Sequence, residues 1–245
     1  MADLLAVLPA LNEEATVATV VGQVRGQLDC DVLVIDDGSS DATAAKARAA
    51  GATVLRHPFN LGVGAALRSG FRFAAERGYR TVIQVDADGQ HDAGEAQRLL
   101  ERLEEAHADI AVGSRFTAGF EVGRMRRASM RVLSRIISRR LGVTITDTTS
   151  GFRAFGTRAI ERFARAYPSA YLSDTVEALL LASDWDLVVV EEPVQMHPRQ
   201  GGAPSAGGVK SVFHLARLFM VIALHNVRRP LVTSWPMPEP EEPPS

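Results

Sequence analysis

The residues best suited to chemistry are two carboxylates one residue apart, Asp86 and Asp88, which follow an apolar run. At a sheet edge two such charges need a countercharge, and a hard divalent cation, Mg²⁺ or Mn²⁺, supplies it while substrate phosphate oxygens complete its coordination shell. The metal would offset charge on a departing nucleoside diphosphate. An EF-hand is excluded, because His91 and Gln97 replace its glycine and glutamate. A solvated turn is the remaining alternative, and the other polar clusters disfavour it.

Two further polar segments follow predicted strands, Pro9–Glu13 and Asp36–Ser39. Asp37 could accept hydrogen bonds from a base or ribose. The same run could instead be a turn into the next helix, capped by Ser40 or Asp41, and both interpretations can hold together.

The run Asn60–Gly64 resembles a dinucleotide fingerprint only superficially. It follows the third predicted strand rather than the first, and Leu67 stands at the position of the third glycine, so a hydride-transfer enzyme is disfavoured. We expect a turn into the helix that begins near residue 63.

The predicted helix 124–141 is strongly basic. Arg127, Arg131 and Arg135 follow one another at four-residue spacing and form a stripe, which suits phosphate recognition. A solvated helix face is the alternative, favoured most for Arg135 and two later arginines. The arginines of this helix are Arg124, Arg126, Arg127, Arg131, Arg135, Arg139 and Arg140.

The segment Asp147–Arg153 places polar residues and a glycine between apolar segments. We expect an active-site loop anchored by Phe152 and Phe155. Arg199 precedes the glycine-rich run Gly201–Gly208, a candidate mobile loop, and could clamp a diphosphate as that loop closes. An ordinary exposed arginine is the alternative.

The elements that must position these groups alternate between short apolar runs and amphipathic stretches, which predicts parallel βαβ units and an α/β sheet. The polar clusters would then meet beyond the carboxyl ends of the strands. Gly51 and Gly78 should end the second and third helices. The predicted strands are Leu4–Leu8, Val32–Ile35, Thr53–Leu55, Thr81–Val85, Ile110–Val112 and Leu187–Val190; the predicted helices are 15–20, 41–50, 63–77, 93–106, 124–141, 158–166, 173–183 and 211–227.

The 245 residues, 46% of them hydrophobic, suit one large domain with an appendage, and the net charge of −2 gives no sign of a nucleic-acid partner. One cysteine, Cys30, excludes an internal disulfide and fits a buried thiol in a reducing compartment. No signal peptide and no run of about 20 apolar residues is found, so we expect a cytoplasmic, soluble body. The expected divisions are a catalytic domain at 1–210, an amphipathic helix at 211–229 that lies on a membrane, a partner or the body, and a disordered proline-rich tail at 230–245.

Five motifs in order resemble family 2 glycosyltransferases, particularly the branch of dolichol-phosphate mannosyltransferases and polyprenyl-phosphate glycosyltransferases. They are Pro9–Glu13, Asp36–Ser39, Asp86–His91, Gly113–Arg115 and Asp147–Arg153. The resemblance covers about residues 3–225. It implies a GT-A fold, in which a mostly parallel central sheet is flanked by helices, and an inverting transfer of a hexose, mannose or glucose, from a GDP- or UDP-sugar to a lipid phosphate.

The same resemblance implies roles for individual residues. The expected metal ligands, for Mg²⁺ or Mn²⁺, are Asp86, Asp88 and Gln90. The expected donor-binding residues are Pro9, Leu11, Asn12, Glu13, Asp37, Asp86, Ala87, Asp88, Ser150, Arg153, Glu177 and Arg199, with Gly202 and Ser205 in the closing loop. The expected catalytic residues are Asp88, Arg115, Arg127, Arg131 and Asp147, of which the arginines would receive the acceptor phosphate.

Two departures from the family pattern stand out. Ala206 occupies a position where the closing loop usually has a lysine, and the transmembrane helices that end many relatives are missing from this sequence. The resemblance therefore implies a peripheral protein at the cytoplasmic face of the membrane, held there by its amphipathic helix or by a small membrane subunit.

The chemistry of the acceptor separates two hypotheses. A lipid phosphate is already anionic at neutral pH and can attack the sugar without a general base, so arginines need only position it. A hydroxyl acceptor on a cell-wall or soluble glycan would need a carboxylate base, and Asp174 is the candidate. A non-catalytic nucleotide-binding protein is disfavoured by the intact carboxylate pair.

Overall fold

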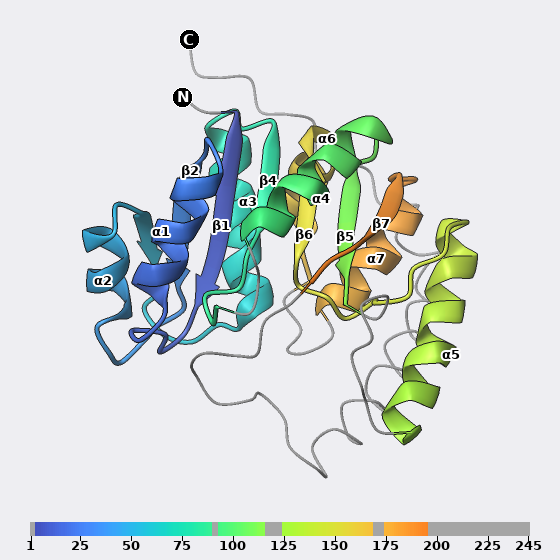
Figure 1. Ribbon diagram of the computed structural model, residues 1–245, viewed down its shortest axis with the longest axis horizontal. Coiled ribbons are helices and arrows are strands. Elements are labelled where there is room, and N and C mark those ends of the chain that lie inside the picture. The colour runs from blue at the N-terminus through green and yellow to red at the C-terminus, as the bar shows by residue number, and fades with distance from the viewer. Residues whose placement is uncertain (1–2, 90–92, 116–123, 169–173, 196–245) are drawn as a thin grey trace.

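The computed structural model describes residues 3–89, 93–115, 124–168 and 174–195. They form one seven-stranded sheet in the order β3-β2-β1-β4-β6-β5-β7, with helices on both faces (Figure 1). The strands are β1 (Leu4–Ala10), β2 (Asp31–Asp36), β3 (Thr53–Arg56), β4 (Thr81–Gln84), β5 (Ile110–Ser114), β6 (Arg153–Gly156) and β7 (Val189–Pro193). The helices are α1 (Val17–Gln27), α2 (Thr43–Ala49), α3 (Val63–Glu76), α4 (Ala93–Glu105), α5 (Arg124–Leu141), α6 (Thr157–Ala166) and α7 (Asp174–Asp184).

The sheet is mostly parallel, which confirms the predicted fold class. Strands β3, β2, β1 and β4 pair in parallel, as do β5 and β7. Strand β6 lies antiparallel between β4 and β5. The sequence analysis left residues 153–156 without a strand, and it ended α1 too early, since this helix runs to Gln27.

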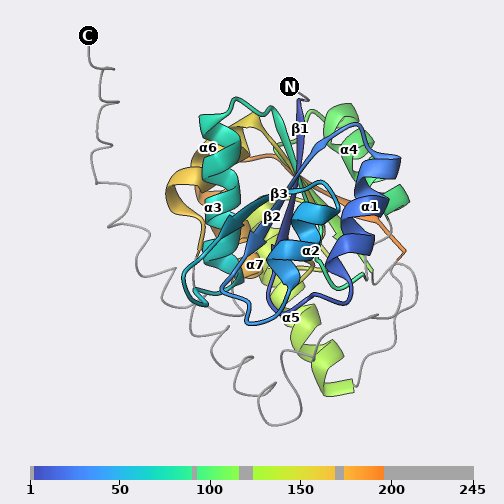
Figure 2. The ribbon, with the colours of Figure 1, turned by 90° about the vertical axis from the view of Figure 1, so that its left-hand side faces the viewer.

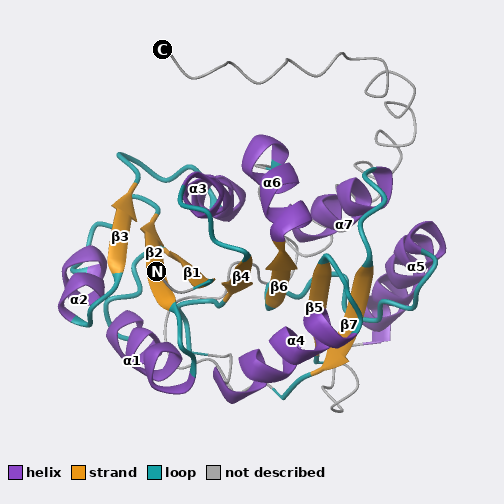
Figure 3. Ribbon diagram, turned by 90° about the horizontal axis from the view of Figure 1, so that it is seen from above, coloured by secondary structure: helices purple, strands orange, loops and turns teal. Residues whose placement is uncertain are grey.

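Two hydrophobic cores fill the faces of the sheet. Helices α3, α6 and α7 cover one face, and α1, α2 and α4 cover the other (Figures 2 and 3). The strands supply both cores because their alternate side chains point to opposite faces. Within the described residues no helix is long and apolar enough to cross a membrane.

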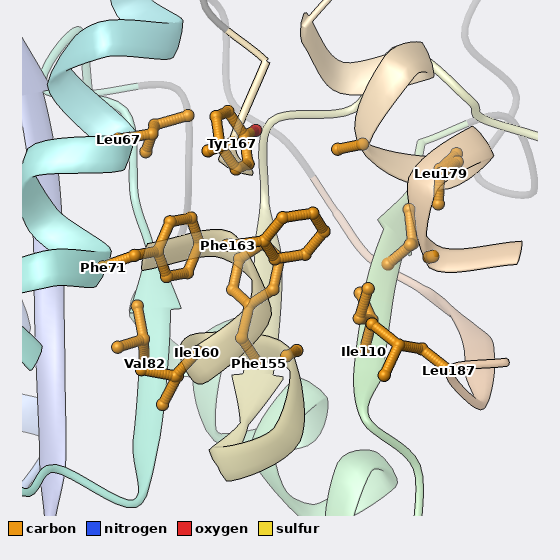
Figure 4. Close-up of a cluster of buried hydrophobic side chains, with 14 of the residues drawn as sticks. Leu67, Phe71, Val82, Ile110, Phe155, Ile160, Phe163, Tyr167, Leu179 and Leu187 are labelled. Atoms are coloured by element: carbon orange, nitrogen blue, oxygen red, sulfur yellow. The ribbon is translucent and has the colours of Figure 1, made fainter. Parts of the chain in front are cut away.

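An aromatic cluster closes the first core beneath the carboxyl edge of the sheet (Figure 4). Phe71 of α3 meets Phe155 edge-on at a centroid distance of 4.8 Å, and Tyr167, just after α6, lies 5.2 Å from Phe71. Such pairs add about 0.5–1.5 kcal/mol each beyond the burial of their area. The cluster fixes α3 and α6 against β6. Phe155 is fully buried, as is Phe152 on the other face, so both predicted anchors of the loop before β6 are confirmed.

The predicted helix ends are confirmed at two glycines. Gly51 and Gly78 follow α2 and α3 with φ angles of 91° and 75°, a left-handed conformation that glycine adopts without a steric penalty. At the start of α2, Asp41 accepts a hydrogen bond from the Thr43 amide at 2.9 Å, although the N-cap position itself is Ala42.

The topology brings the predicted polar segments to one edge. Strands β1, β2, β4, β5 and β7 all end there, and the antiparallel β6 begins there. Helix α5 extends past this edge beside β7 (Figure 1). Several predictions lie outside the described residues: Gln90, Arg199, the closing loop, the helix at 211–227 and the tail. The side chain of Arg127 is likewise not described.

Candidate active site

The carboxylate pair lies directly beyond β4. Asp88 is buried and Asp86 half-buried, with the buried Ala87 between them. Gly151 of the segment before β6 faces this turn: a Cβ on Gly151 would lie 3.3 Å from each carboxylate oxygen of Asp86 and 3.1 Å from Nε2 of Gln84. The backbone of the loop therefore packs closely against the Asp86 carboxylate, and a side chain at residue 151 would require its neighbours to move by a few tenths of an ångström.

The residues at this turn fit a divalent metal. The pair offers hard oxygen ligands, and the absence of a side chain at Gly151 preserves a cradle beside Asp86. Oε1 of Gln84, the last residue of β4, is buried and has no hydrogen-bond partner. Among the described residues there is no group of three or more His, Cys, Asp or Glu side chains that could hold a metal. Mg²⁺ is commonly held by one or two carboxylates when phosphates complete its shell, and the pair supplies that number.

The side chain of Arg153 hydrogen-bonds to the loop that precedes β6. Its side chain is fully buried at the start of β6, paired with Gln84 of β4 and with β5. Its guanidinium donates to the carbonyl oxygens of Ser150, Thr148 and Thr175 at 2.9, 3.2 and 2.9 Å. These bonds join the loop before β6 to the start of α7. The fully buried guanidinium of Arg153 therefore holds these two segments together.

Arg115, just after β5, is held by the loop. Its Nε donates to the Asp147 carboxylate at 2.7 Å, and its Nη2 donates to Thr149 Oγ1 at 3.1 Å. Asp147 is fully buried, whereas 24% of the Arg115 side chain is exposed. Charge-assisted bonds of this kind fix the direction of the guanidinium. Arg115 is therefore oriented at the sheet edge and still reachable by an anion.

Glu191 of β7 also forms hydrogen bonds with the segment that leads into this loop. Its carboxylate accepts hydrogen bonds from the amides of Thr146 and Asp147 at 2.7 and 2.9 Å and from the Thr146 hydroxyl at 2.9 Å. The sequence analysis missed this residue, because nothing local links it to a segment 44 residues earlier.

The segment after β1 is tied to the segment after β2. Asn12 has a φ angle of 54°, which asparagine tolerates. Its backbone N–H donates to Ser39 Oγ at 2.9 Å, and its side-chain Oδ1 accepts from the backbone N–H of Ser40 at 2.9 Å. The amide of Glu13 donates to Thr43 Oγ1 at 2.9 Å. Leu11 is exposed and Pro9 half-buried beside them. The two predicted nucleoside-binding segments therefore form one surface.

Asp37 is buried and faces the loop that enters α3. Its carboxylate accepts hydrogen bonds from the amides of Leu61 and Gly62 at 3.0 and 2.7 Å. It also lies 2.6 Å from Nδ1 of the buried His57. Gly62, with a φ angle of 93°, forms the predicted turn into α3. His57 was not found in the sequence, where a single histidine carries no motif.

A second buried acid, Asp174, opens α7. Burial raises its pKa to about 6, against the nearby charge of Arg153, which lowers it. Burial also raises the pKa of Tyr167 far above its usual value, and the Tyr167 hydroxyl has no hydrogen-bond partner. Asp174 is the first residue of α7. Glu177 lies about one turn further along the same helix and is half-buried. The negative charge of Asp86 also raises the pKa of Asp174, by less than burial does.

The structure thus brings the segments that carry most of the described site residues to one edge of the sheet. The segments carrying Asn12, Asp37, Asp86, Arg115 and Asp147 all meet at the carboxyl edge. Arg131 is exposed on α5, the helix that extends past that edge.

Comparisons with known proteins agree with this arrangement. A family model described as "Glycosyl transferase family 2" matches residues 6–164. A polyprenol monophosphomannose synthase of Mycolicibacterium smegmatis is 32% identical over 215 residues, which cover 83% of this chain and 81% of that protein. An undecaprenyl-phosphate mannosyltransferase of Micrococcus luteus is 33% identical over 224 residues, which cover 84% of this chain and 88% of that protein.

A solved structure shares the fold. Glucosyl-3-phosphoglycerate synthase of Mycobacterium tuberculosis, in complex with Mn²⁺, UDP and glucosyl-3-phosphoglycerate, matches with a TM-score of 0.67 and 20% identity over 91% of this chain and 79% of that chain. At this identity the likeness shows the fold alone.

Proposed function

Because this chain belongs to glycosyl transferase family 2 and is a glycosyltransferase of GT-A fold, we propose that it transfers a hexose to a polyprenyl or dolichyl phosphate. The proposed donor is a GDP- or UDP-sugar, with mannose or glucose as the hexose. Two similar proteins that match over most of their length are named for polyprenol and undecaprenyl phosphate acceptors. A lipid acceptor implies work at a membrane surface, and we propose the cytoplasmic face.

The observation that carries the proposal is the placement of opposite charges at one edge of the sheet. The carboxylates of Asp86 and Asp88 follow β4, and the anchored guanidinium of Arg115 follows β5. Strand β6 lies between these two strands and brings the loop that holds Arg115 against Asp86. One side of the site thus suits a metal-bound diphosphate, and the other suits an acceptor phosphate.

In the proposed mechanism the residues mainly bind and orient. Asp86 and Asp88, with Gln90, would hold Mg²⁺ or Mn²⁺, which when bound offsets negative charge on the diphosphate leaving group. Arg115, oriented by Asp147, would position the acceptor phosphate on the opposite face of the sugar. A phosphate oxygen forms the new bond to C1 as the bond to the diphosphate breaks, which inverts the anomeric centre. No side chain needs to remove a proton, because the phosphate is already ionised.

The segments Pro9–Glu13 and Asp36–Ser39 are proposed to hold the nucleoside, because their hydrogen bonds make them one surface next to the carboxylate pair. Arg127 and Arg131 of α5 are proposed as further phosphate contacts, Glu177 and Ser150 as donor contacts, and Arg199 as the residue that closes over the diphosphate. The catalytic domain is proposed to span residues 1–210, and the following amphipathic helix to meet the membrane or a small membrane subunit.

A second candidate function is transfer to a hydroxyl with Asp174 as the base. The raised pKa of Asp174, about 6, brings this carboxyl nearer to the range in which a base works at neutral pH. Under this alternative Asp174→Asn abolishes transfer while donor binding survives; under the lipid-phosphate proposal the variant keeps transferring.

The proposal is tested by incubating the protein with Mn²⁺, polyprenyl phosphate and a panel of radiolabelled GDP- and UDP-hexoses. We expect label to enter the organic extract with one of these donors, and Asp88→Ala to abolish it. Absence of extractable label with every donor, from protein that a melting curve shows to be folded, would reject the lipid phosphate as acceptor.

A further inference from the structure

Strand β7 carries two adjacent glutamates, Glu191 and Glu192, whose side chains have different partners. Glu192 accepts a hydrogen bond from Nη2 of Arg98 on α4 at 2.8 Å. Glu191 accepts its hydrogen bonds from Thr146 and Asp147, ahead of β6. Neighbouring residues of a strand point to opposite faces of the sheet, so one substitution made at each position in turn affects two different surroundings.

The Glu191 carboxylate binds the main chain at residues 146 and 147. Its Oε1 accepts the backbone N–H groups of Thr146 and Asp147 at 2.7 and 2.9 Å, and its Oε2 accepts the Thr146 hydroxyl at 2.9 Å. Three of the roughly four acceptor positions of a carboxylate are thus used. Hydrogen bonds to an ionised group are about twice as strong as those between neutral groups. The carboxylate therefore fixes the backbone of these two residues relative to β7.

Residues 145–147, the junction segment, are also held by β5 and α5. The Thr146 hydroxyl donates to Glu191, so at 2.7 Å from Oγ of Ser114 it accepts from the Ser114 hydroxyl at the end of β5. The Ser138 hydroxyl of α5 accepts the backbone N–H of Ile145 at 2.9 Å. Three elements thus meet at the junction segment, and Glu191 supplies a charged contact to it.

The junction segment contains the residue that orients Arg115. Asp147 is fully buried; its Oδ2 accepts from Nε of Arg115 at 2.7 Å, and its Oδ1 accepts from the Thr149 hydroxyl at 3.1 Å. Because both oxygens are engaged and the side chain is enclosed, a displacement of the Asp147 backbone moves its carboxylate. The guanidinium of Arg115, which is 24% exposed, then changes direction at the sheet edge.

Two other roles for Glu191 lead to different expectations. A carboxylate that only stabilises the edge of the sheet would lower stability when replaced, but the direction of Arg115 in the folded molecules would not change. A carboxylate that removes a proton from an acceptor must be able to reach it, whereas the three hydrogen bonds direct both Glu191 oxygens at the junction segment.

We propose that Glu191 is a positioning residue for the acceptor phosphate. Glu191 holds the junction segment, which places Asp147, and Asp147 directs Arg115. Glu191 itself touches neither substrate. The link from Glu191 to Arg115 does not depend on the proposed function, whereas the phosphate as its target rests on that function.

The link is tested without substrate, by NMR measurement of hydrogen exchange at the side-chain Nε–H of Arg115. Glu191→Met removes the carboxylate oxygens at nearly constant side-chain length, and Glu192→Met makes the same change at the next residue as the matched control. We expect exchange about tenfold faster than in the wild type for Glu191→Met, and at the wild-type rate for Glu192→Met. Equal rates in the two variants would overturn the link.

A milder variant covers the case in which Glu191→Met does not fold. Glu191→Gln keeps an acceptor oxygen but loses the charge, and it should speed exchange at Arg115 by about threefold. A wild-type rate in this variant would then overturn the link. So would an Arg115 Nε–H that exchanges in the wild type as fast as that of the exposed Arg135.

Transfer kinetics test the role in the reaction, with Mn²⁺, polyprenyl phosphate and the donor that the wild type uses. Relative to Glu192→Met, Glu191→Met should lower kcat/KM for polyprenyl phosphate about tenfold, because functional groups need placement within about 0.5 Å. Calorimetry should give an unchanged Kd for GDP or UDP with Mn²⁺. An equal loss of nucleotide affinity would indicate a generally loosened site and overturn the positioning role. Faster exchange at Arg115 with unchanged kcat/KM would also overturn that role and leave the link.

A double-mutant cycle asks whether Glu191 acts through Arg115. In an Arg115→Lys background, Glu191→Met should lower kcat/KM for the lipid phosphate by less than it does in the wild type, since lysine lacks the planar fork that Asp147 directs. Fully independent losses would overturn the positioning role. Failure of the wild type to transfer to polyprenyl phosphate would reject the proposed function and the phosphate as target, and the exchange measurement would still decide the link.

Discussion

Replacing Gly151 by alanine places a methyl group between the end of β4 and the loop before β6. The new Cβ would lie 3.1 Å from Nε2 of Gln84 and 3.3 Å from each carboxylate oxygen of Asp86. These separations are shorter than ordinary van der Waals contact, so the neighbours must move by a few tenths of an ångström. Gly151 has a φ angle outside the left-handed region, so alanine adds no backbone strain.

The magnitude follows from what must move. Overpacking costs about 1–3 kcal/mol in a tight core, and we expect the lower end because Asp86 is only half-buried. Activity should suffer more than stability, since functional groups need placement within about 0.5 Å. A displacement of a few tenths of an ångström at Asp86 should lower kcat about tenfold, given that about 1 Å costs about a hundredfold.

Gly156→Ala, at the other end of β6, is the matched control. Its added Cβ would meet its nearest neighbours at 3.6 to 3.9 Å, which is ordinary contact. Transfer rates at saturating Mn²⁺ and urea denaturation of both variants give the comparison. The reasoning is refuted if Gly151→Ala keeps the kcat of Gly156→Ala, or if loss of folded protein accounts for its lower rate.

Three further predictions concern the loop, the buried acid and the metal. Glu191→Gln weakens three hydrogen bonds to Thr146 and Asp147, so urea denaturation should show a free energy of unfolding lower by about 2 kcal/mol; an unchanged value contradicts the support we assign to Glu191. Burial raises the pKa of Asp174 from 3.8 to about 6, so its ionisation destabilises the folded state as pH rises through that window. Asp174→Asn should therefore be more stable than the wild type by up to about 3 kcal/mol at pH 8 and equally stable at pH 3, and equal stability at both contradicts the burial argument. Chelation by EDTA should abolish transfer and excess Mn²⁺ should restore it; activity that survives chelation contradicts metal dependence.

The sequence predicted the elements of the fold with strong local patterns. Helix α3 matched closely because its amphipathic run ends at a glycine, and the two glycines that follow α2 and α3 were found by the same rule. Strand β6 was missed because Arg153 to Gly156 is short and has no apolar alternation; only pairing with both β4 and β5 makes it a strand.

The residues of the candidate site likewise fall into those with a local sequence pattern and those whose partners lie elsewhere in the chain. Asp86 and Asp88 could be found because two carboxylates at a strand end form a local pattern. Glu191 and His57 could not be found in this way. Glu191 accepts a hydrogen bond from Asp147, which lies far along the chain. His57 contacts Asp37, a residue that also accepts a hydrogen bond from the backbone amide of Leu61. Arg153 was predicted to bind the donor, but its burial and its three carbonyl partners depend on the tertiary fold, which no spacing in the sequence reveals.

The central claim is that Asp86 and Asp88 hold a divalent cation against the diphosphate of the donor. Its most direct test is the electron paramagnetic resonance signal of free Mn²⁺, titrated with the protein in the presence and absence of GDP or UDP. We predict that the free-ion signal falls steeply when the preferred nucleotide is present, because phosphate oxygens complete the shell, and that Asp86→Asn and Asp88→Asn each remove this effect. Equal binding of Mn²⁺ by the wild type and both folded variants would contradict the account.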